Sequence, residues 1–172
     1  MPAISPGTLV LADETATASL AVALAARARP GDVLTLSGVL GAGKTSFARF
    51  FIRALGIGEE VPSPTFTLVQ TYETTRGTVW HFDLYRLTSP EEVWELGFEE
   101  ALIDGIILIE WPERIGALLP RERLDLTLAA GAAPQARVAP PVRQPGRRQR
   151  AEGLRQDGAW PGQPIQRCRF AQ

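Results

Sequence analysis

Residues 38–45 have the sequence GVLGAGKT, which fits the phosphate-binding pattern G-x-x-x-x-G-K-T at every position. Glycine adopts backbone conformations that other residues avoid, so the peptide N–H groups of such a loop close around a polyphosphate. In this pattern Lys44 reaches the β- and γ-phosphates, and the hydroxyl of Thr45 ligates Mg²⁺. A helix that starts at Lys44 also points its positive end at the phosphates. The loop therefore predicts a site for a nucleoside triphosphate and magnesium.

The segments that flank this loop support the same interpretation. Residues 33–37 (VLTLS) form a short apolar run that is typical of a buried strand. Residues 46–55 carry apolar side chains on one side and precede Gly56, a natural helix stop. Strand, glycine-rich loop and helix in this order distinguish a phosphate site from a turn that precedes a lysine by chance.

Two acidic residues stand where predicted strands end. Asp83 closes the run 78–83, and Glu110 follows the continuously apolar run 106–109. Ligands of open α/β sheets bind outside the carboxyl ends of the strands. Acids at this position hold Mg²⁺, directly or through water, or polarise the attacking water. The alternative for each residue is a surface carboxylate at a strand end.

Three other features are compatible with more than one interpretation. Ser63 and Thr65 flank a proline on a loop, which resembles a switch segment that senses the γ-phosphate but also fits a plain turn. Trp111 either lies against the nucleotide or caps the core. His81 is the chain's one histidine. Alone it makes no metal site, and it fits a structural or surface position in a strand.

The hydrophobic pattern predicts the elements that must position these groups. The fold class is α/β: a single P-loop NTPase-type domain, with a mostly parallel sheet, an antiparallel hairpin and helices on both faces. Asp13 and Ser89 are the expected caps of two of the helices. Helices are predicted at 14–29, at 44–55 and from 90, and strands at 33–37, 66–72, 78–83, 106–109 and 124–128.

Composition limits the setting. A chain of 172 residues suits one domain with a real core. Cys168 is the only cysteine, so no internal disulfide is possible. The sequence has no apolar run long enough to span a bilayer and no signal-peptide pattern. We expect a cytoplasmic protein without a membrane partner.

The two ends of the chain differ in composition. Residues 1–130 hold 10 basic and 17 acidic side chains, whereas residues 131–172 hold eight arginines and two acids. An acidic body does not suggest a direct grip on nucleic acid. We interpret residues 1–138 as the P-loop domain, and residues 139–172, rich in proline, arginine and glutamine, as an atypical disordered tail.

The nucleotide itself is constrained by an absent residue type. The chain contains no asparagine. The Asn-Lys-x-Asp motif by which Ras-like GTPases read guanine therefore cannot form, and ATP is the expected nucleotide.

Four separated motifs together resemble the TsaE (YjeE) family, small bacterial ATPases required for the N6-threonylcarbamoyladenosine (t⁶A) modification of tRNA. The resemblance covers about residues 8–138. Its motifs are GAGKT at 41–45, VPSPTFTLV at 61–69, HFDLYRL at 81–87 and IEWP at 109–112.

The resemblance implies a weak Mg²⁺-dependent ATPase that binds ATP and acts on the TsaB–TsaD complex. TsaD transfers the threonylcarbamoyl group to adenosine 37 of tRNA, so a TsaE-like protein supports repeated turnover and meets tRNA only through the complex. The implied catalytic residues are Lys44, Asp83 and Glu110, and the implied metal ligands are Thr45, Asp83 and Glu110. The implied nucleotide-binding residues are Glu14, Gly38, Gly41, Ala42, Gly43, Lys44, Thr45, Ser46, Ser63, Thr65 and Trp111.

The chain departs from the family pattern in two places. Val39 replaces an aspartate of the usual loop, which removes a carboxylate near the phosphates but leaves the backbone cradle. After Val138 the similarity stops, although the family continues with a β-rich segment. A shifted reading frame or an unrelated tail would produce this change.

Two other functions compete with the family role. A small-molecule kinase would use the same phosphate cradle, with several arginines to clamp the transferring group. A nucleotide-gated binding protein would switch partners with little hydrolysis, and would tolerate the loss of Glu110.

Overall fold

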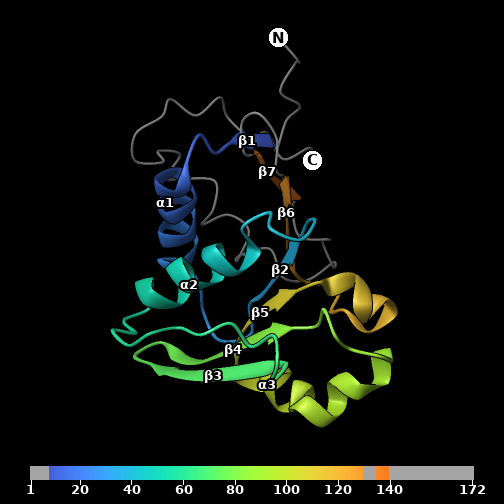
Figure 1. Cartoon of the computed structure of the whole chain (residues 1–172). Coiled ribbons are helices and arrows are strands. Elements are labelled where there is room, and N and C mark those ends of the chain that lie inside the picture. The colour runs from blue at the N-terminus through green and yellow to red at the C-terminus, as the bar shows by residue number, and fades with distance from the viewer. Residues whose placement is uncertain (1–7, 130–134, 140–172) are drawn as a thin grey trace.

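The computed structural model describes residues 8–129 and 135–139. Within these ranges the strands form one seven-stranded sheet in the order β1-β7-β6-β2-β5-β4-β3 (Figure 1). The strands are β1 (Thr8–Val10), β2 (Val33–Ser37), β3 (Val69–Thr74), β4 (Gly77–Asp83), β5 (Ile106–Glu110), β6 (Leu124–Ala129) and β7 (Gln135–Ala139). The helices are α1 (Glu14–Ala25), α2 (Lys44–Ala54) and α3 (Phe98–Asp104), with 3₁₀ segments at Pro90–Leu96, Pro112–Arg114 and Gly116–Leu118.

The centre of the sheet is parallel and its flanks are antiparallel. Strand β2 pairs in parallel with β6 on one side and with β5 on the other, and β5 pairs in parallel with β4. Antiparallel pairing joins β3 to β4, β6 to β7, and β7 to β1. As a result, the carboxyl ends of β2, β5 and β4 lie at one edge of the sheet.

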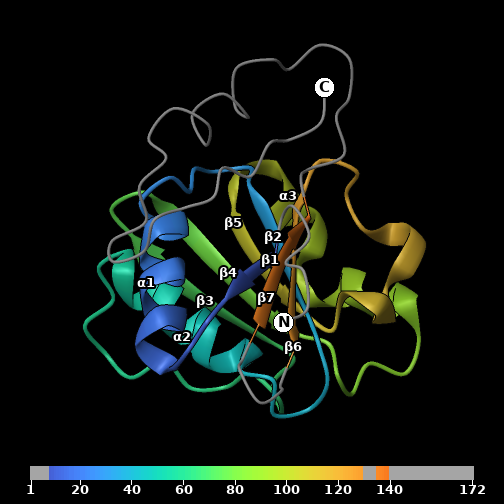
Figure 2. The same ribbon diagram turned by 90° about the horizontal axis from the view of Figure 1, so that it is seen from above.

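Helices cover both faces of the sheet. Figure 2 shows α1 and α2 on one side and α3 on the other. Strand β5 is buried along its whole length because both of its faces are covered, which explains its continuous apolar sequence. Leu108 belongs to the core beneath α1 and α2, whereas Ile107 and Ile109 belong to the core beneath α3. The expected α/β class, the antiparallel hairpin and the helices on both faces are confirmed.

Two element boundaries differ from the predictions by three residues or more. The first helix ends at Ala25, because the chain then tightens into a turn in which the N–H of Arg27 bonds to the carbonyl of Leu24. The third strand begins at Val69, because residues 64–67 form a turn closed by a 2.6 Å bond from the Leu68 N–H to the Pro64 carbonyl. Residues 66–68 are therefore not part of the hairpin.

The segment after Ser89 has its predicted cap but a different helix type. The Glu92 carboxylate accepts a 3.2 Å hydrogen bond from the Ser89 N–H, as a capping box requires. The segment is nevertheless a 3₁₀ helix, and it ends at Gly97, whose φ of 81° is left-handed. Helix α3 begins directly after this residue.

The sequence pattern did not predict β7. It includes Ala139, which we had assigned to the disordered tail, and it adds a strand between β6 and β1. Residues 140–172 of that tail lie outside the described residues. Among the helices of the described part, none has both the length and the apolar character needed to cross a membrane.

Phe82 and Phe66 provide a matched test of the core beneath α3. Phe82 is fully buried, stacks on Trp80 and meets the edge of Phe98 at 5.5 Å between ring centroids. Phe66 is 82% exposed. We expect Phe82→Ala to lower the free energy of unfolding by about 3–5 kcal/mol, because a cavity replaces a packed ring.

The same change at Phe66 should cost less than about 0.5 kcal/mol. Urea unfolding followed by circular dichroism measures both values. Equal losses for the two variants would contradict the assignment of Phe82 to the core.

Candidate functional site

The loop between β2 and α2 depends on three glycines with left-handed backbones. The φ angles of Gly38, Gly41 and Gly43 are 139°, 79° and 96°. A Cβ on Gly38 would also lie 2.2 Å from the carbonyl oxygen of Leu128 in β6, so a side chain there would displace the β6 backbone. Helix α2 begins at Lys44, as the motif predicted, and the turn is closed by a bond from Ala42 N–H to Val39 O. The glycine loop thus stands at the carboxyl end of a central strand.

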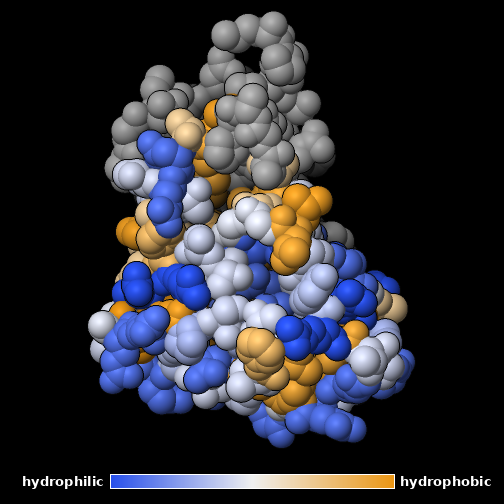
Figure 3. All heavy atoms as spheres, in the orientation of Figure 1, coloured by the Kyte–Doolittle hydropathy of each residue, from blue (hydrophilic) through white to orange (hydrophobic). Residues whose placement is uncertain are grey.

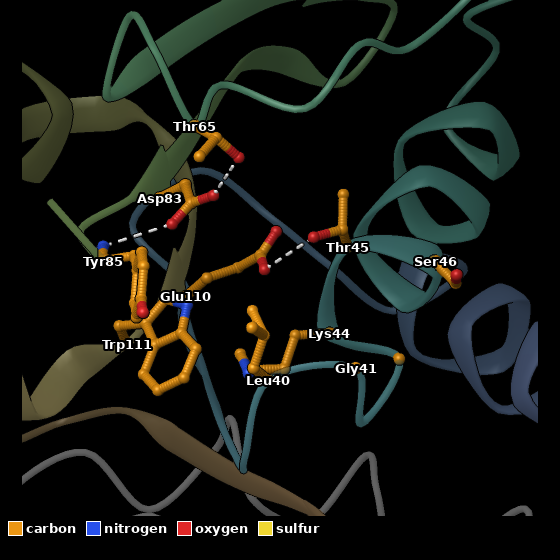
Figure 4. Close-up of a pocket in the computed structure, with 11 residues that line it drawn as sticks. Leu40, Gly41, Lys44, Thr45, Ser46, Thr65, Asp83, Tyr85, Glu110 and Trp111 are labelled. Carbon is orange, nitrogen blue, oxygen red and sulfur yellow. Dashed lines mark hydrogen bonds between the residues drawn. The ribbon is translucent and has the colours of Figure 1, made fainter.

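A hollow of about 230 Å³, here named the P-loop hollow, opens beside this loop. Figure 4 shows the side chains of its wall, which come from the glycine loop, from the start of α2, from the loop before β3 and from the ends of β4 and β5. Its lining residues are Leu40, Gly41, Gly43, Lys44, Thr45, Ser46, Thr65, Asp83, Tyr85, Glu110 and Trp111.

Glu110 joins the loop helix to the sheet. Its Oε2 accepts a 2.9 Å hydrogen bond from the Thr45 hydroxyl (Figure 4), and its Oε1 lies 2.9 Å from Nε2 of His81. Glu110 is 1% exposed and His81 is fully buried. Because both carboxylate oxygens have partners, this buried acid is compensated.

Asp83 is held by the loop that precedes β3. Its Oδ2 accepts a 2.7 Å bond from the Thr65 hydroxyl, and its Oδ1 accepts a bond from the Tyr85 N–H. The Thr65 hydroxyl has one proton and donates it to Asp83. Ser63 must therefore be the donor in the 2.6 Å contact between the Ser63 and Thr65 hydroxyls. The loop with the two hydroxyls therefore contacts an acid of the hollow.

Lys44 is turned toward its own loop. Its Nζ donates to the carbonyls of Gly38 at 2.6 Å and Val39 at 2.9 Å, and it lies 3.7 Å from the ring centroid of Trp111. Burial lowers the pKa of this ammonium, and the nearby carboxylates, Glu110 first among them, oppose that shift. The cationic form is thus held by carbonyl oxygens and an aromatic face.

Trp111 occupies its place through a strained backbone. Its φ is 58°, a conformation uncommon for residues other than glycine, and its N–H bonds to the Leu36 carbonyl at the end of β2. The Tyr85 ring packs against it at 4.8 Å between centroids. Trp111 both lines the hollow and packs against the core beneath α3, so neither of its two expected positions is excluded.

A second hollow of about 200 Å³ lies on the other flank of the α2 start. It contains Glu14, which the family resemblance had placed near the base, together with Arg49 and Arg53 of α2. Ser46 lines both hollows. The two hollows therefore meet at Ser46 near the start of α2.

The structure brings most predicted residues together, with a few exceptions. The P-loop hollow contains nine of them, namely Gly41, Gly43, Lys44, Thr45, Ser46, Thr65, Asp83, Glu110 and Trp111. Three predicted residues do not line the hollow but are hydrogen-bonded to the glycine loop or to lining residues, namely Gly38, Ala42 and Ser63. Glu14 faces the second hollow only.

Sequence reasoning missed three residues of the site. Leu40 and Tyr85 line the hollow, and His81 contacts Glu110. The signal for His81 was its spacing from Asp83, because residues two apart in a strand share a face. Tyr85 follows Asp83 by two residues but lies beyond the strand, where periodicity gives no direction.

The oxygen atoms of the hollow suit magnesium. Thr45, Asp83 and Glu110 offer a hydroxyl and two carboxylates, which are the hard ligands that Mg²⁺ prefers. Among the described residues, no group of three histidine, cysteine or acidic side chains is placed to hold a metal alone. This donor set fits a cation that shares its ligands with phosphates and water.

Comparison with known proteins gives consistent matches. The family model described as "Threonylcarbamoyl adenosine biosynthesis protein TsaE" matches residues 11–138. A Rickettsia felis protein named tRNA threonylcarbamoyladenosine biosynthesis protein TsaE is 50% identical over 121 residues, which are 70% of this chain and 71% of the relative. A Bacillus subtilis protein of the same name is 43% identical over 113 residues, 65% of this chain and 70% of that one.

A solved structure agrees with these matches. The crystal structure of YdiB from Bacillus subtilis has a TM-score of 0.61 and 33% identity, and the match covers 77% of this chain and 84% of that one. The span matched by the family model contains every residue that lines the P-loop hollow.

Alanine substitutions at Gly38 and Gly56 distinguish the cost of steric crowding from the cost of backbone strain. Both have positive φ, but a Cβ on Gly56 meets nothing within 4 Å. We expect Gly56→Ala to cost about 1 kcal/mol of unfolding free energy, the usual order for this strain. Gly38→Ala should cost about 2–4 kcal/mol, because the β6 backbone must also move.

Thermal and urea unfolding measure this difference. Equal costs for the two alanine variants would show that the loop does not press against β6 as the structure has it.

Proposed function

The chain belongs to the TsaE family, and on this premise we propose that it binds and hydrolyses ATP in the t⁶A37 modification of tRNA. We further propose that it acts on the TsaB–TsaD complex and so supports repeated turnover of the transferase. The main observation behind this proposal is the hydrogen bond from Thr45 to Glu110 in a hollow that is also lined by Asp83 and by residues of a complete P-loop.

The loop and Lys44 are the proposed phosphate binders. The N–H groups around the three glycines provide a concave cradle, and the start of α2 adds a partial positive charge. In the structure Lys44 spends two of its donors on loop carbonyls and rests on Trp111. A bound polyphosphate would offer this ammonium a stronger, charged partner than those carbonyls.

Thr45, Asp83 and Glu110 are the proposed ligands and hydrolytic group. Bound magnesium would neutralise phosphate charge as it develops. When the Thr45 hydroxyl turns away from Glu110, the Oε2 of that carboxylate becomes free to accept a proton from an attacking water. Because Glu110 is 1% exposed, its carboxylate acts in a site with little competing solvent.

Exposed apolar side chains near the hollow support the proposal of a protein partner. Val39 and Leu40 of the loop are 65% and 74% exposed, and Phe66 is 82% exposed. Figure 3 shows an apolar area over the loop between β2 and α2. Exposed apolar groups beside a functional site are typical of a protein contact surface. Val39, in place of the family aspartate, is one of these exposed residues, and its carbonyl still accepts a hydrogen bond from Lys44.

The decisive experiment is a multi-turnover assay of t⁶A formation on tRNA. It contains TsaB, TsaD, threonylcarbamoyl-AMP and ATP, with or without this chain. We expect product to exceed one equivalent of TsaD only when the chain is present. We expect Glu110→Gln to lower the hydrolysis kcat by about 10²–10⁴-fold, the usual contribution of a general base.

Glu99→Gln on the exposed side of α3 is the matched control, since it removes a carboxylate far from the hollow. It should match the unmodified chain. A chain that adds no product, or a Glu110→Gln variant with full activity, would overturn the proposal.

A further inference from the structure

His81 occupies a buried position in β4 where an apolar side chain would leave no polar atom without a partner. It lies in β4 opposite Leu108 of β5, and Val79, two residues earlier on the same strand face, is part of the core beneath α1 and α2. The His81 ring is fully buried, and its Nδ1 has no hydrogen-bond partner among the described residues. A buried polar atom without a partner weakens the fold. Fold stability therefore does not explain this histidine.

The other ring nitrogen, Nε2, donates a hydrogen bond to Glu110. Nε2 lies 2.9 Å from Oε1 of Glu110, and a carboxylate offers only acceptors, so Nε2 carries the proton and donates. Strand register makes this contact possible. Asp83 is opposite Glu110 and His81 is opposite Leu108, so His81 reaches Glu110 diagonally across the strand pair.

The contact from His81 does not depend on the direction of the Thr45 hydroxyl. In the structure Thr45 donates to Oε2 of Glu110 and Nε2 of His81 lies beside Oε1. A cation would use a lone pair of the Thr45 oxygen and leave the hydroxyl its proton, which can point to Glu110 or to another acceptor. In either case the bond from His81 fixes a carboxylate that otherwise rotates about three side-chain bonds.

We propose that His81 is the positioning residue of Glu110. Its Nε2–H fixes Oε1, so that Oε2 faces the space between Thr45 and Asp83 where the attacking water must stand. This inference rests on the proposed function, because it gives Glu110 the task of a base. His81 itself touches neither substrate nor water in this account.

The kinetic test compares two substitutions of His81 in the full chain with TsaB and TsaD. His81→Phe keeps the ring volume but removes the donor, whereas His81→Gln keeps an N–H near the place of Nε2. We expect His81→Phe to lower the ATPase kcat by about ten- to a hundredfold, the order for a misplaced catalytic group, with the Kd for ATP within about threefold. His81→Gln should recover most of the loss.

A double-mutant comparison separates positioning from a structural role. In a Glu110→Gln background, His81→Phe should lower kcat no further, because the group it positions is already disabled. Tyr72→Phe is the matched control, since it removes another buried atom without a partner, the Tyr72 hydroxyl in β3. It should leave kcat unchanged.

A signal that does not depend on activity completes the test. His81 is the only histidine in the chain, so the imidazole ¹⁵N spectrum contains a single ring. We expect protonated Nε2 and bare Nδ1, with the Nε2 signal shifting in Glu110→Gln. A ring protonated only at Nδ1, an unchanged kcat in His81→Phe, or multiplicative losses in the double variant would each overturn the inference.

Failure of the proposed function would look different. If the unmodified chain, with TsaB and TsaD, hydrolyses no ATP, the ATPase assignment falls, and with it the role of His81 in that reaction. The ¹⁵N spectrum would still show whether His81 holds Glu110.

Discussion

The site depends on the parallel pairing of β2, β5 and β4, whose carboxyl ends are level. Register places Glu110 opposite both Leu36 and Asp83. The P-loop that leaves β2, and the acids that end the other two strands, are thereby brought to one edge of the sheet. A slip of one residue between β4 and β5 would turn their side chains to opposite faces and take this arrangement apart.

A second constraint follows from burial at that edge. Lys44, Asp83 and Glu110 are each less than 5% exposed, and ions in such positions need partners. The protein supplies loop carbonyls for Lys44, one hydroxyl and one backbone N–H for Asp83, and a hydroxyl and an imidazole for Glu110. The charged groups of the site are thus compensated by atoms of the protein itself.

The sequence predicted those features that depend on residues close together in the chain. The glycine loop, its strand and the start of α2 were correct because phosphate-binding loops have fixed spacing and a fixed backbone need. Asp83 and Glu110 were found because an acid after an apolar strand marks a strand end. The α/β class followed from the continuous apolar run of β5, which requires cover on both faces.

The missed features depend on non-local pairing or on local backbone geometry. His81 acquires its role from a diagonal contact with another strand. The late start of β3 depends on a turn closed at Pro64 and on the positive φ of Leu68. Strand β7 is stabilised by pairing with β6 and β1, which its own irregular composition does not signal.

Our central proposal is that Thr45, Asp83 and Glu110 form the magnesium and hydrolysis group of the hollow, so that the chain binds ATP together with the cation. Isothermal titration of ATP into the chain, with and without Mg²⁺, tests it most directly. The account predicts tighter binding with Mg²⁺ and loss of that gain in Thr45→Val, whereas equal affinity with and without the cation would contradict it.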